Sequence, residues 1–165
     1  MIRIIKSFLV LLFVLTLTQT SFAQIRYGND AYEIALPSVS GDTLKLSSLK
    51  GKVVLLDFWA SWCGPCRTSN KQLTKLYPKY KAKGFEIFGV SFDEDKNQWK
   101  KAIDKDKIIW LQVNDDGGRM NAQTAIKWNI EAIPTSYLID KNGKLVAMDL
   151  EGKELEKALK YLLKE

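Results

Sequence analysis

The sequence predicts an α/β fold in which a central mixed β-sheet is flanked by helices on both faces. Two continuous runs of β-branched and aromatic residues, Lys52–Trp59 and Phe85–Phe92, are typical of central strands covered on both faces. Each run is followed by a segment predicted to be helical, and the chain closes with a strand pair and an amphipathic helix. This order of elements favours a mixed sheet with helices on both sides.

The N-terminal half begins with a predicted β extension. Tyr32–Leu36 and Thr43–Leu46 alternate between polar and apolar residues around a turn, which predicts a small hairpin. After the strand at Lys52–Trp59, a helix is expected from about Pro65 to Ala82. Gly84 follows as a residue suited to end that helix.

The C-terminal half contains more, shorter elements. An acidic stretch at residues 93–95 resembles a helix start, and Asn142-Gly143 is a strong hairpin signal. In chain order, the expected elements are a helix, a short strand, a helix, two hairpin strands and a final helix: Asn97–Asp106, Ile108–Val113, Met120–Trp128, Pro134–Asp140, Lys144–Asp149 and Glu154–Leu163.

The chain is expected to begin with a signal peptide, residues 1–23. Arg3 and Lys6 flank the start of an apolar run, Phe8–Leu17, and Ser21-Phe22-Ala23 places small residues at the two positions that a signal peptidase reads. The run is shorter than the ~20 apolar residues of an ordinary transmembrane helix. We therefore expect residues 24–165 to form one domain that is periplasmic or otherwise exported. An uncleaved N-terminal membrane anchor is the alternative.

The charge pattern indicates no nucleic-acid partner. The formal net charge is +6, but Lys96–Lys107 and Lys153–Lys164 mix both signs at helical spacing, as solvated helix surfaces do. The chain has no glycine-rich phosphate loop, no histidine and only two cysteines, so a four-ligand zinc site lacks its ligands. We expect a monomer without cofactor or metal.

The two cysteines lie in the motif Trp-Cys-Gly-Pro-Cys at Trp62–Cys66. If a helix starts there, Cys63 lies at its N-terminus, where free N–H groups and the helix dipole favour a thiolate. Pro65 suits the first turn, since its missing N–H has no partner within the helix. The thiolate is the nucleophile in disulfide exchange, so the motif predicts a redox centre. A structural disulfide and a chance pair of buried thiols are the alternatives.

The chain resembles the thioredoxin superfamily across most of Leu44–Leu163. The matching segments are LLDFWASWCGPC at Leu55–Cys66, AIPTSYLIDKNGK at Ala132–Lys144, and Gly152 before the last helix. With its N-terminal extension, its predicted signal and an added strand–helix unit around Phe85–Asp116, it looks most like the exported TlpA/ResA-like branch. The resemblance implies a thioredoxin-like fold with an N-terminal β extension and an inserted strand–helix unit.

The resemblance also implies the catalytic residues. Cys63 would be the exposed attacking thiolate, and the more buried Cys66 would resolve the mixed disulfide and close the Cys63–Cys66 bond. Asp57 lies six residues before Cys63 in an apolar strand, at the position of thioredoxin's buried acid. Desolvation should raise the pKa of Asp57 and make it a proton acceptor for Cys66. The alternative is an aspartate that only caps the strand end.

Substrate contacts are implied around the motif. Ile133-Pro134 resembles the superfamily's cis-proline bond, where Ile133 would pair its backbone with the substrate. A trans proline is the alternative. The residues expected to contact substrate are Trp62, Gly64, Pro65, Ile133, Pro134 and Gly152. Members of the branch often carry a glutamate six residues after the first cysteine, and here that position is Ser69, so a role in cytochrome c maturation is not implied.

The expected function is an exported thiol–disulfide oxidoreductase that reduces protein disulfides through a mixed disulfide. Gly64-Pro65 is the dipeptide of reducing thioredoxins, so we expect a membrane electron donor of the thiol-transfer type to regenerate the dithiol. Two alternatives are a peroxiredoxin-like thiol peroxidase and a non-catalytic module that binds partners in the cis-proline groove. Ser61-Trp62-Cys63 does not reproduce the peroxidatic pattern, and a pure binder needs neither Cys66 nor Asp57.

Overall fold

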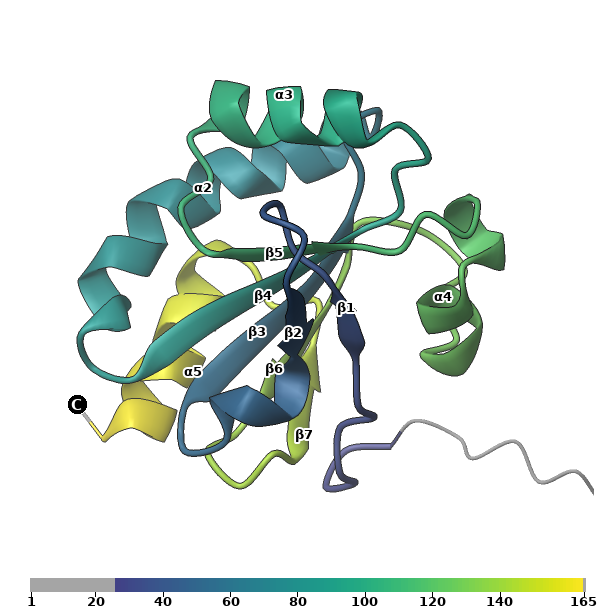
Figure 1. Ribbon diagram of the computed structural model, residues 1–165. Coiled ribbons are helices and arrows are strands. Elements are labelled where there is room, and N and C mark those ends of the chain that lie inside the picture. The colour runs from purple at the N-terminus through teal and green to yellow at the C-terminus, as the bar shows by residue number, and fades with distance from the viewer. Residues whose placement is uncertain (1–25, 165) are drawn as a thin grey trace, which may run out of the picture.

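The computed structural model describes residues 26–164, and the predicted signal peptide, residues 1–23, lies outside them. Five strands form a mixed sheet in the order β5-β4-β3-β6-β7 (Figure 1). The central strand β3 pairs parallel with β4 and antiparallel with β6. The strands are β3 (Val53–Trp59), β4 (Phe85–Ser91), β5 (Leu111–Asn114), β6 (Thr135–Ile139) and β7 (Leu145–Met148). The predicted mixed sheet and its two central strands are confirmed.

Helices cover both faces of the sheet, as predicted. One face packs against α2 (Gly64–Lys81), α3 (Lys96–Asp106) and α5 (Gly152–Leu163). The other face packs against the 3-10 helix η1 (Leu46–Leu49) and the short helix α4 (Gln123–Lys127). In Figure 1, β1 and β2 lie in front of the sheet, while α2 and α5 lie behind it.

Alternation along β3 decides which side chains face the helices α2 and α5. Leu55 packs in the cluster beneath α2 and α5, and Leu56 packs in the cluster on the opposite face. Successive side chains of a strand point to opposite faces, so Asp57 lies on the same face as Leu55. The only carboxylate of this strand therefore points toward the two helices.

The N-terminal extension is a separate two-stranded hairpin of β1 (Ala35–Pro37) and β2 (Thr43–Lys45). Ser38 at its tip forms a bridge to Val113 in β5. At the other end of this segment, Asp30 bridges to Lys144 beside the β6–β7 turn, and the Lys144 Nζ lies 2.9 Å from the Asp30 Oδ1. The extension thus lies across one face of the sheet.

The inserted unit consists of α3 and β5, and β5 extends the sheet at its edge by pairing parallel with β4. This strand was expected over Ile108–Val113, but it starts three residues later, at Leu111. Lys107 ends α3 in the left-handed conformation, and Ile108 then donates its N–H to Ile103 at 3.0 Å, so Ile108 still belongs to the helix end.

The helix expected over Met120–Trp128 is divided. A 3-10 turn, η2 (Arg119–Asn121), precedes α4, because Ala122 between them has an extended backbone with φ −55° and ψ 142°. Asp115 causes the restart. Its carboxylate accepts hydrogen bonds from the Thr124 N–H at 2.9 Å and from the Thr124 Oγ1 at 2.6 Å, which satisfies the first turn of α4. No helix within residues 26–164 is long and apolar enough to cross a membrane.

Candidate active site

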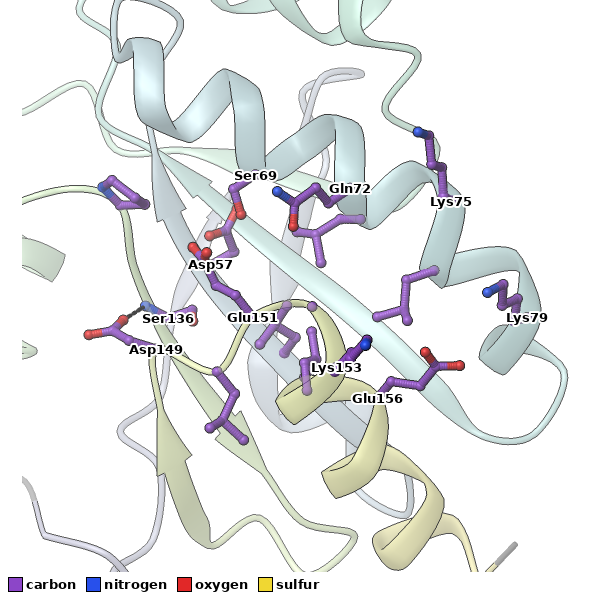
Figure 2. Close-up of a pocket in the computed structure, with 17 residues that line it drawn as sticks. Asp57, Ser69, Gln72, Lys75, Lys79, Ser136, Asp149, Glu151, Lys153 and Glu156 are labelled. Atoms are coloured by element: carbon purple, nitrogen blue, oxygen red, sulfur yellow. Dashed lines mark hydrogen bonds between the residues drawn. The ribbon is translucent and has the colours of Figure 1, made fainter.

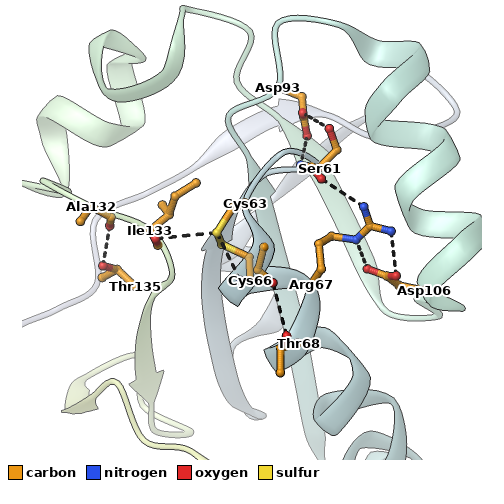
Figure 3. The surroundings of a disulfide bond; sticks show 11 residues. Ser61, Cys63, Cys66, Arg67, Thr68, Asp93, Asp106, Ala132, Ile133 and Thr135 are labelled. Carbon is orange, nitrogen blue, oxygen red and sulfur yellow. Dashed lines mark hydrogen bonds and ion pairs between the residues drawn. A yellow bond between two sulfur atoms is a disulfide. The ribbon is translucent and has the colours of Figure 1, made fainter.

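The disulfide between Cys63 and Cys66 lies at the start of α2, with the two Cα atoms 5.3 Å apart (Figure 3). Cys63 is the N-cap of the helix, and its Sγ accepts a hydrogen bond from the Cys66 N–H at 3.2 Å. Pro65 occupies the first turn. Sulfur at a helix N-cap lies where unpaired N–H groups and the helix dipole stabilise negative charge.

Both cysteines are buried while they are bonded to each other. Cys63 is 6% exposed and Cys66 is 1% exposed, so the expectation of an exposed Cys63 is wrong for the disulfide form. The cause is the loop before β6, because the carbonyl oxygen of Ile133 lies 3.7 Å from the Cys63 Sγ. Trp62, the first residue of the motif, is by contrast 50% exposed. Its ring does not bury the motif but faces solvent and the Arg119 guanidinium, 5.1 Å away.

The peptide bond between Ile133 and Pro134 is cis, so the trans alternative is wrong. The Thr135 Oγ1 donates a hydrogen bond to the carbonyl oxygen of Ala132 at 2.8 Å, which holds the loop together across this bond. Ile133 is partly buried and packs against both core clusters. The structure therefore brings the predicted proline loop directly beside Cys63.

Asp57 is 4% exposed and lies on the α2 side of β3. Burial raises the pKa of Asp57 to about 7, with smaller contributions from the negative charges of Glu151 and Asp149. This agrees with the direction expected from the sequence. No described residue donates a hydrogen bond that the structure assigns to its carboxylate, which speaks against a capping role. Cys66 packs in the same core cluster as Leu55 and Trp59, the residues that flank Asp57 on its face of β3.

A pocket of about 300 Å³ opens between α2 and α5 and reaches Asp57 (Figure 2). Asp57, Ser69 and Glu151 lie near one end of the pocket (Figure 2), and the lining also includes Pro134 and Gly152. Its apolar wall is made of leucines: Leu55, Leu73, Leu76, Leu150 and Leu155. Gly152 is the first residue of α5, with φ +51°, and no atom lies within 4 Å of the position that a Cβ would take. The pocket thus connects the buried carboxylate with solvent.

A second set of polar residues near the disulfide was not found from the sequence. Ser61, Arg67, Asp93 and Asp106 form a hydrogen-bonded network on the α3 side of the motif (Figure 3). The sequence placed Asp93 in a helix start, but Asp95 is the residue that caps α3, accepting from the Asn97 N–H at 2.8 Å. Only the position of Arg67, directly after Cys66, was a usable signal. Its partners come from distant parts of the chain.

The fold and the site together define a thioredoxin-like protein with a Cys-x-x-Cys disulfide at a helix N-terminus. The chain matches the model of the AhpC/TSA family over residues 27–148 and belongs to this family. It is 33% identical over 153 residues to the thiol-disulfide oxidoreductase ResA of Bacillus anthracis, covering 91% of this chain and 86% of the relative. With ResA of Bacillus thuringiensis subsp. konkukian it shares 32% identity over 147 residues, or 88% and 82% of the two chains.

Solved structures agree with these relatives. A thiol-disulfide oxidoreductase from Bacteroides fragilis is 37% identical with a TM-score of 0.75, covering 81% of this chain and 99% of that chain. The thioredoxin domain of a thiol-disulfide oxidoreductase from Bacteroides vulgatus is 36% identical with a TM-score of 0.76, covering 84% and 99%. These matches confirm the predicted class of activity, thiol–disulfide oxidoreduction.

Proposed function

We propose that the protein is exported and reduces disulfide bonds in other proteins. The observation that carries the proposal is the juxtaposition of three features at one helix end. These are the Cys63–Cys66 disulfide, the cis bond before Pro134 and the buried carboxylate of Asp57.

The reaction begins with the dithiol form. The Cys63 thiolate attacks a substrate disulfide, which forms a mixed disulfide and releases one substrate thiolate. Asp57 then accepts the proton of Cys66, and the Cys66 thiolate attacks the Cys63 Sγ. This step closes the Cys63–Cys66 disulfide and releases the second substrate thiolate. The substrate gains two electrons, and the two substrate thiolates take up two protons. A pKa of about 7 makes Asp57 a competent acceptor near neutral pH.

Trp62 and the cis-proline loop supply the surface for a protein substrate. Trp62 presents an exposed aromatic ring directly before Cys63. Gly64 and Pro65 follow in the exposed first turn of α2, and a Cβ at Gly64 would meet no atom within 4 Å, so a chain can approach closely. An extended substrate segment would pair with the backbone at Ile133, as peptides do when they add to an exposed strand edge.

The reducing direction rests on Gly64-Pro65 and on the predicted export. An exported dithiol meets oxidising conditions, so a membrane electron donor of the thiol-transfer type would have to regenerate it. The proposed location is the periplasm or another exported site, with an N-terminal membrane anchor as the alternative. A reduction potential well above that of the glutathione couple would overturn the reducing direction.

Trapping with the Cys66→Ala variant tests the proposal. We expect a mixed disulfide to accumulate on Cys63 in envelope extracts, and mass spectrometry would identify the attached proteins. The Cys63→Ala variant is the matched control and should trap nothing, because the attacking thiolate is absent. Trapping in the cytoplasmic fraction alone would contradict export.

Two further measurements separate the alternatives. Rapid consumption of hydrogen peroxide by Cys63 in the Cys66→Ala variant would favour a thiol peroxidase. Full biological activity of a Cys63→Ser variant would favour a binding module, since that variant keeps the cis-proline loop and loses the nucleophile.

A further inference from the structure

Ser61, two residues before Cys63, is held by a buried carboxylate on one side (Figure 3). Asp93 is 2% exposed and follows β4. Its carboxylate accepts hydrogen bonds from the Ser61 N–H at 2.9 Å and from the Ser61 Oγ at 2.5 Å. The Ser91 Oγ donates a third at 2.7 Å. Both the amide and the hydroxyl of Ser61 are therefore bound by one anion.

Arg67 holds Ser61 on the other side. Its Nη1 donates a hydrogen bond to the carbonyl oxygen of Ser61 at 3.1 Å. The rest of the guanidinium forms a two-pronged ion pair with Asp106 at the end of α3. Nη2 donates to Oδ1 at 2.7 Å, and Nε donates to Oδ2. The Asp106 side chain is only 2% exposed, whereas that of Arg67 is 22% exposed.

Ser61 lies in a turn at residues 60–63 that leads directly into the redox motif. The Cys63 N–H donates to the carbonyl oxygen of Ala60 at 3.1 Å, so Ser61 lies inside the turn that delivers Cys63 to the helix start. In the hydrogen bonds described for residues 60–63, Arg67 is the one cationic side chain that donates to this turn. A guanidinium keeps its charge throughout the pH range in which thiols ionise.

Other charges also face this region. Asp57 lies on β3, and Arg119 stacks on Trp62 from the segment before α4. Asp149 and Glu151 line the same pocket as Asp57 and raise its pKa. None of these is bonded to Arg67 or Asp106, whose interactions lie within the network around Ser61. Substitutions in the Arg67–Asp106 pair therefore remove no hydrogen bond made by Asp57, Asp149 or Glu151.

We propose that Arg67 and Asp106 are an opposed pair of positioning residues that set the ionisation of Cys63 and the reduction equilibrium of the disulfide. The positive charge of Arg67 favours the thiolate of Cys63. The negative charge of Asp106 partly cancels this effect, while its ion pair with Arg67 holds the guanidinium against Ser61. Reduction adds two electrons and one proton when Cys63 ends as a thiolate and Cys66 as a thiol. A stabilised thiolate therefore makes the disulfide easier to reduce. The inference deepens the proposed function but depends only on the thiol–disulfide chemistry.

Removing either charge breaks the same ion pair and has opposite electrostatic consequences. Arg67→Gln leaves Asp93 and Asp106 unopposed, and Asp106→Asn leaves Arg67 uncompensated. A unit charge about 8 Å away shifts an ionisation equilibrium by roughly twofold at the dielectric constant of water and by about thirtyfold at an effective dielectric constant of about 20. We expect shifts of this size in opposite directions.

The experiment measures two quantities on the folded, purified wild type and variants. Equilibration with glutathione buffers gives the reduction equilibrium constant, and ultraviolet thiolate absorbance during a pH titration gives the midpoint of Cys63 ionisation. Arg67→Gln should move the midpoint up and favour the disulfide by about threefold or more. Asp106→Asn should do the reverse, and the double variant should lie close to the wild type. Arg67→Lys keeps the positive charge, so its midpoint of Cys63 ionisation should stay close to that of the wild type.

A purely structural network predicts another pattern. Loosening the turn in either way would move both single variants in the same direction, and this outcome would overturn the inference, as would the absence of any shift. If Arg67→Gln does not fold, Asp106→Asn should still lower the midpoint of Cys63 ionisation while Arg67→Lys leaves it near the wild type, whereas a loosened turn would shift both variants in the same direction. Failure of the wild type to exchange with glutathione would instead overturn the oxidoreductase function itself.

Discussion

The two sides of the disulfide differ in how their buried carboxylates are satisfied. On the α3 side, Asp93 is 2% exposed and accepts three hydrogen bonds from Ser61 and Ser91. On the α5 side, Asp57 is 4% exposed and faces a pocket of about 300 Å³, with no assigned donor among the described residues.

The difference shows that burial alone does not define the role of an acid. Donors around a carboxylate stabilise its charged form, whereas burial without donors destabilises that form. On the α3 side, the carboxylate of Asp93 therefore holds the turn at residues 60–63 in place. The α5 side is built to exchange a proton. The same substitution, aspartate to asparagine, should consequently have opposite effects on stability on the two sides.

The largest expected effect is a gain of stability in Asp57→Asn. The pKa of Asp57 is raised from 3.8 to about 7, so the folded protein keeps a proton that the unfolded chain loses. Stability then falls as pH rises from about 4 to about 7, by roughly 4 kcal/mol at 1.36 kcal/mol per pKa unit. The neutral asparagine avoids this loss. Chemical unfolding at about pH 8 should show the variant to be more stable by up to ~4 kcal/mol.

The control for this prediction is the same pair of proteins at about pH 4, where Asp57 is protonated in the folded state and the two stabilities should converge. Both proteins must be in the disulfide form. An equal difference at both pH values would contradict a raised pKa and indicate a packing effect.

The same variant should lose activity. Without a proton acceptor, the attack of Cys66 on the mixed disulfide should slow by about a hundredfold, within the usual range for general base catalysis. In the wild type this rate should rise with pH through about 7, as Asp57 ionises, and the variant should lack that rise. Rapid-mixing kinetics of mixed-disulfide resolution measures both. An unchanged pH profile would exclude Asp57 as the acceptor.

The smallest expected effect lies on the α3 side. Asp93→Asn replaces an acceptor of three hydrogen bonds by an amide whose NH₂ group faces donors. The variant should lose about 2 kcal/mol of stability, because charged hydrogen bonds contribute roughly 1.5 to 3 kcal/mol each and some remain. Thermal unfolding of both variants at the same pH measures whether Asp93→Asn loses stability relative to the wild type while Asp57→Asn gains it. A gain of stability in Asp93→Asn would break the contrast between the two sides.

The sequence was sufficient for the fold and for the residues of the reacting centre. Continuous apolar strands and an Asn-Gly turn are local signals, so β3, β4 and the β6–β7 hairpin could be predicted closely. Cys63, Cys66 and Asp57 lie within ten residues of one another on a strand and the helix that follows it. Their relative placement therefore needs little tertiary information.

What the sequence left out depends on contacts between distant segments. The division of the helix at Ala122 follows from Asp115, which caps Thr124 across a loop. The pairing of Arg67 with Asp106 joins positions 39 residues apart and needs the packing of α3 on α2. The burial of Cys63 likewise follows from a carbonyl oxygen 70 residues away. Each is decided by the assembled fold.

The bridge between Asp30 and Lys144 determines at which end of the domain the N-terminal segment joins the fold. Lys144 belongs to the turn beside the start of β3, since Gly51 donates its N–H to Lys141 at 2.9 Å. Cys63 follows the other end of that seven-residue strand, about 20 Å away at ~3.3 Å per residue. The N-terminal segment therefore joins the fold at the end of β3 opposite to the dithiol, so an attachment through that segment would leave the dithiol end of the domain uncovered.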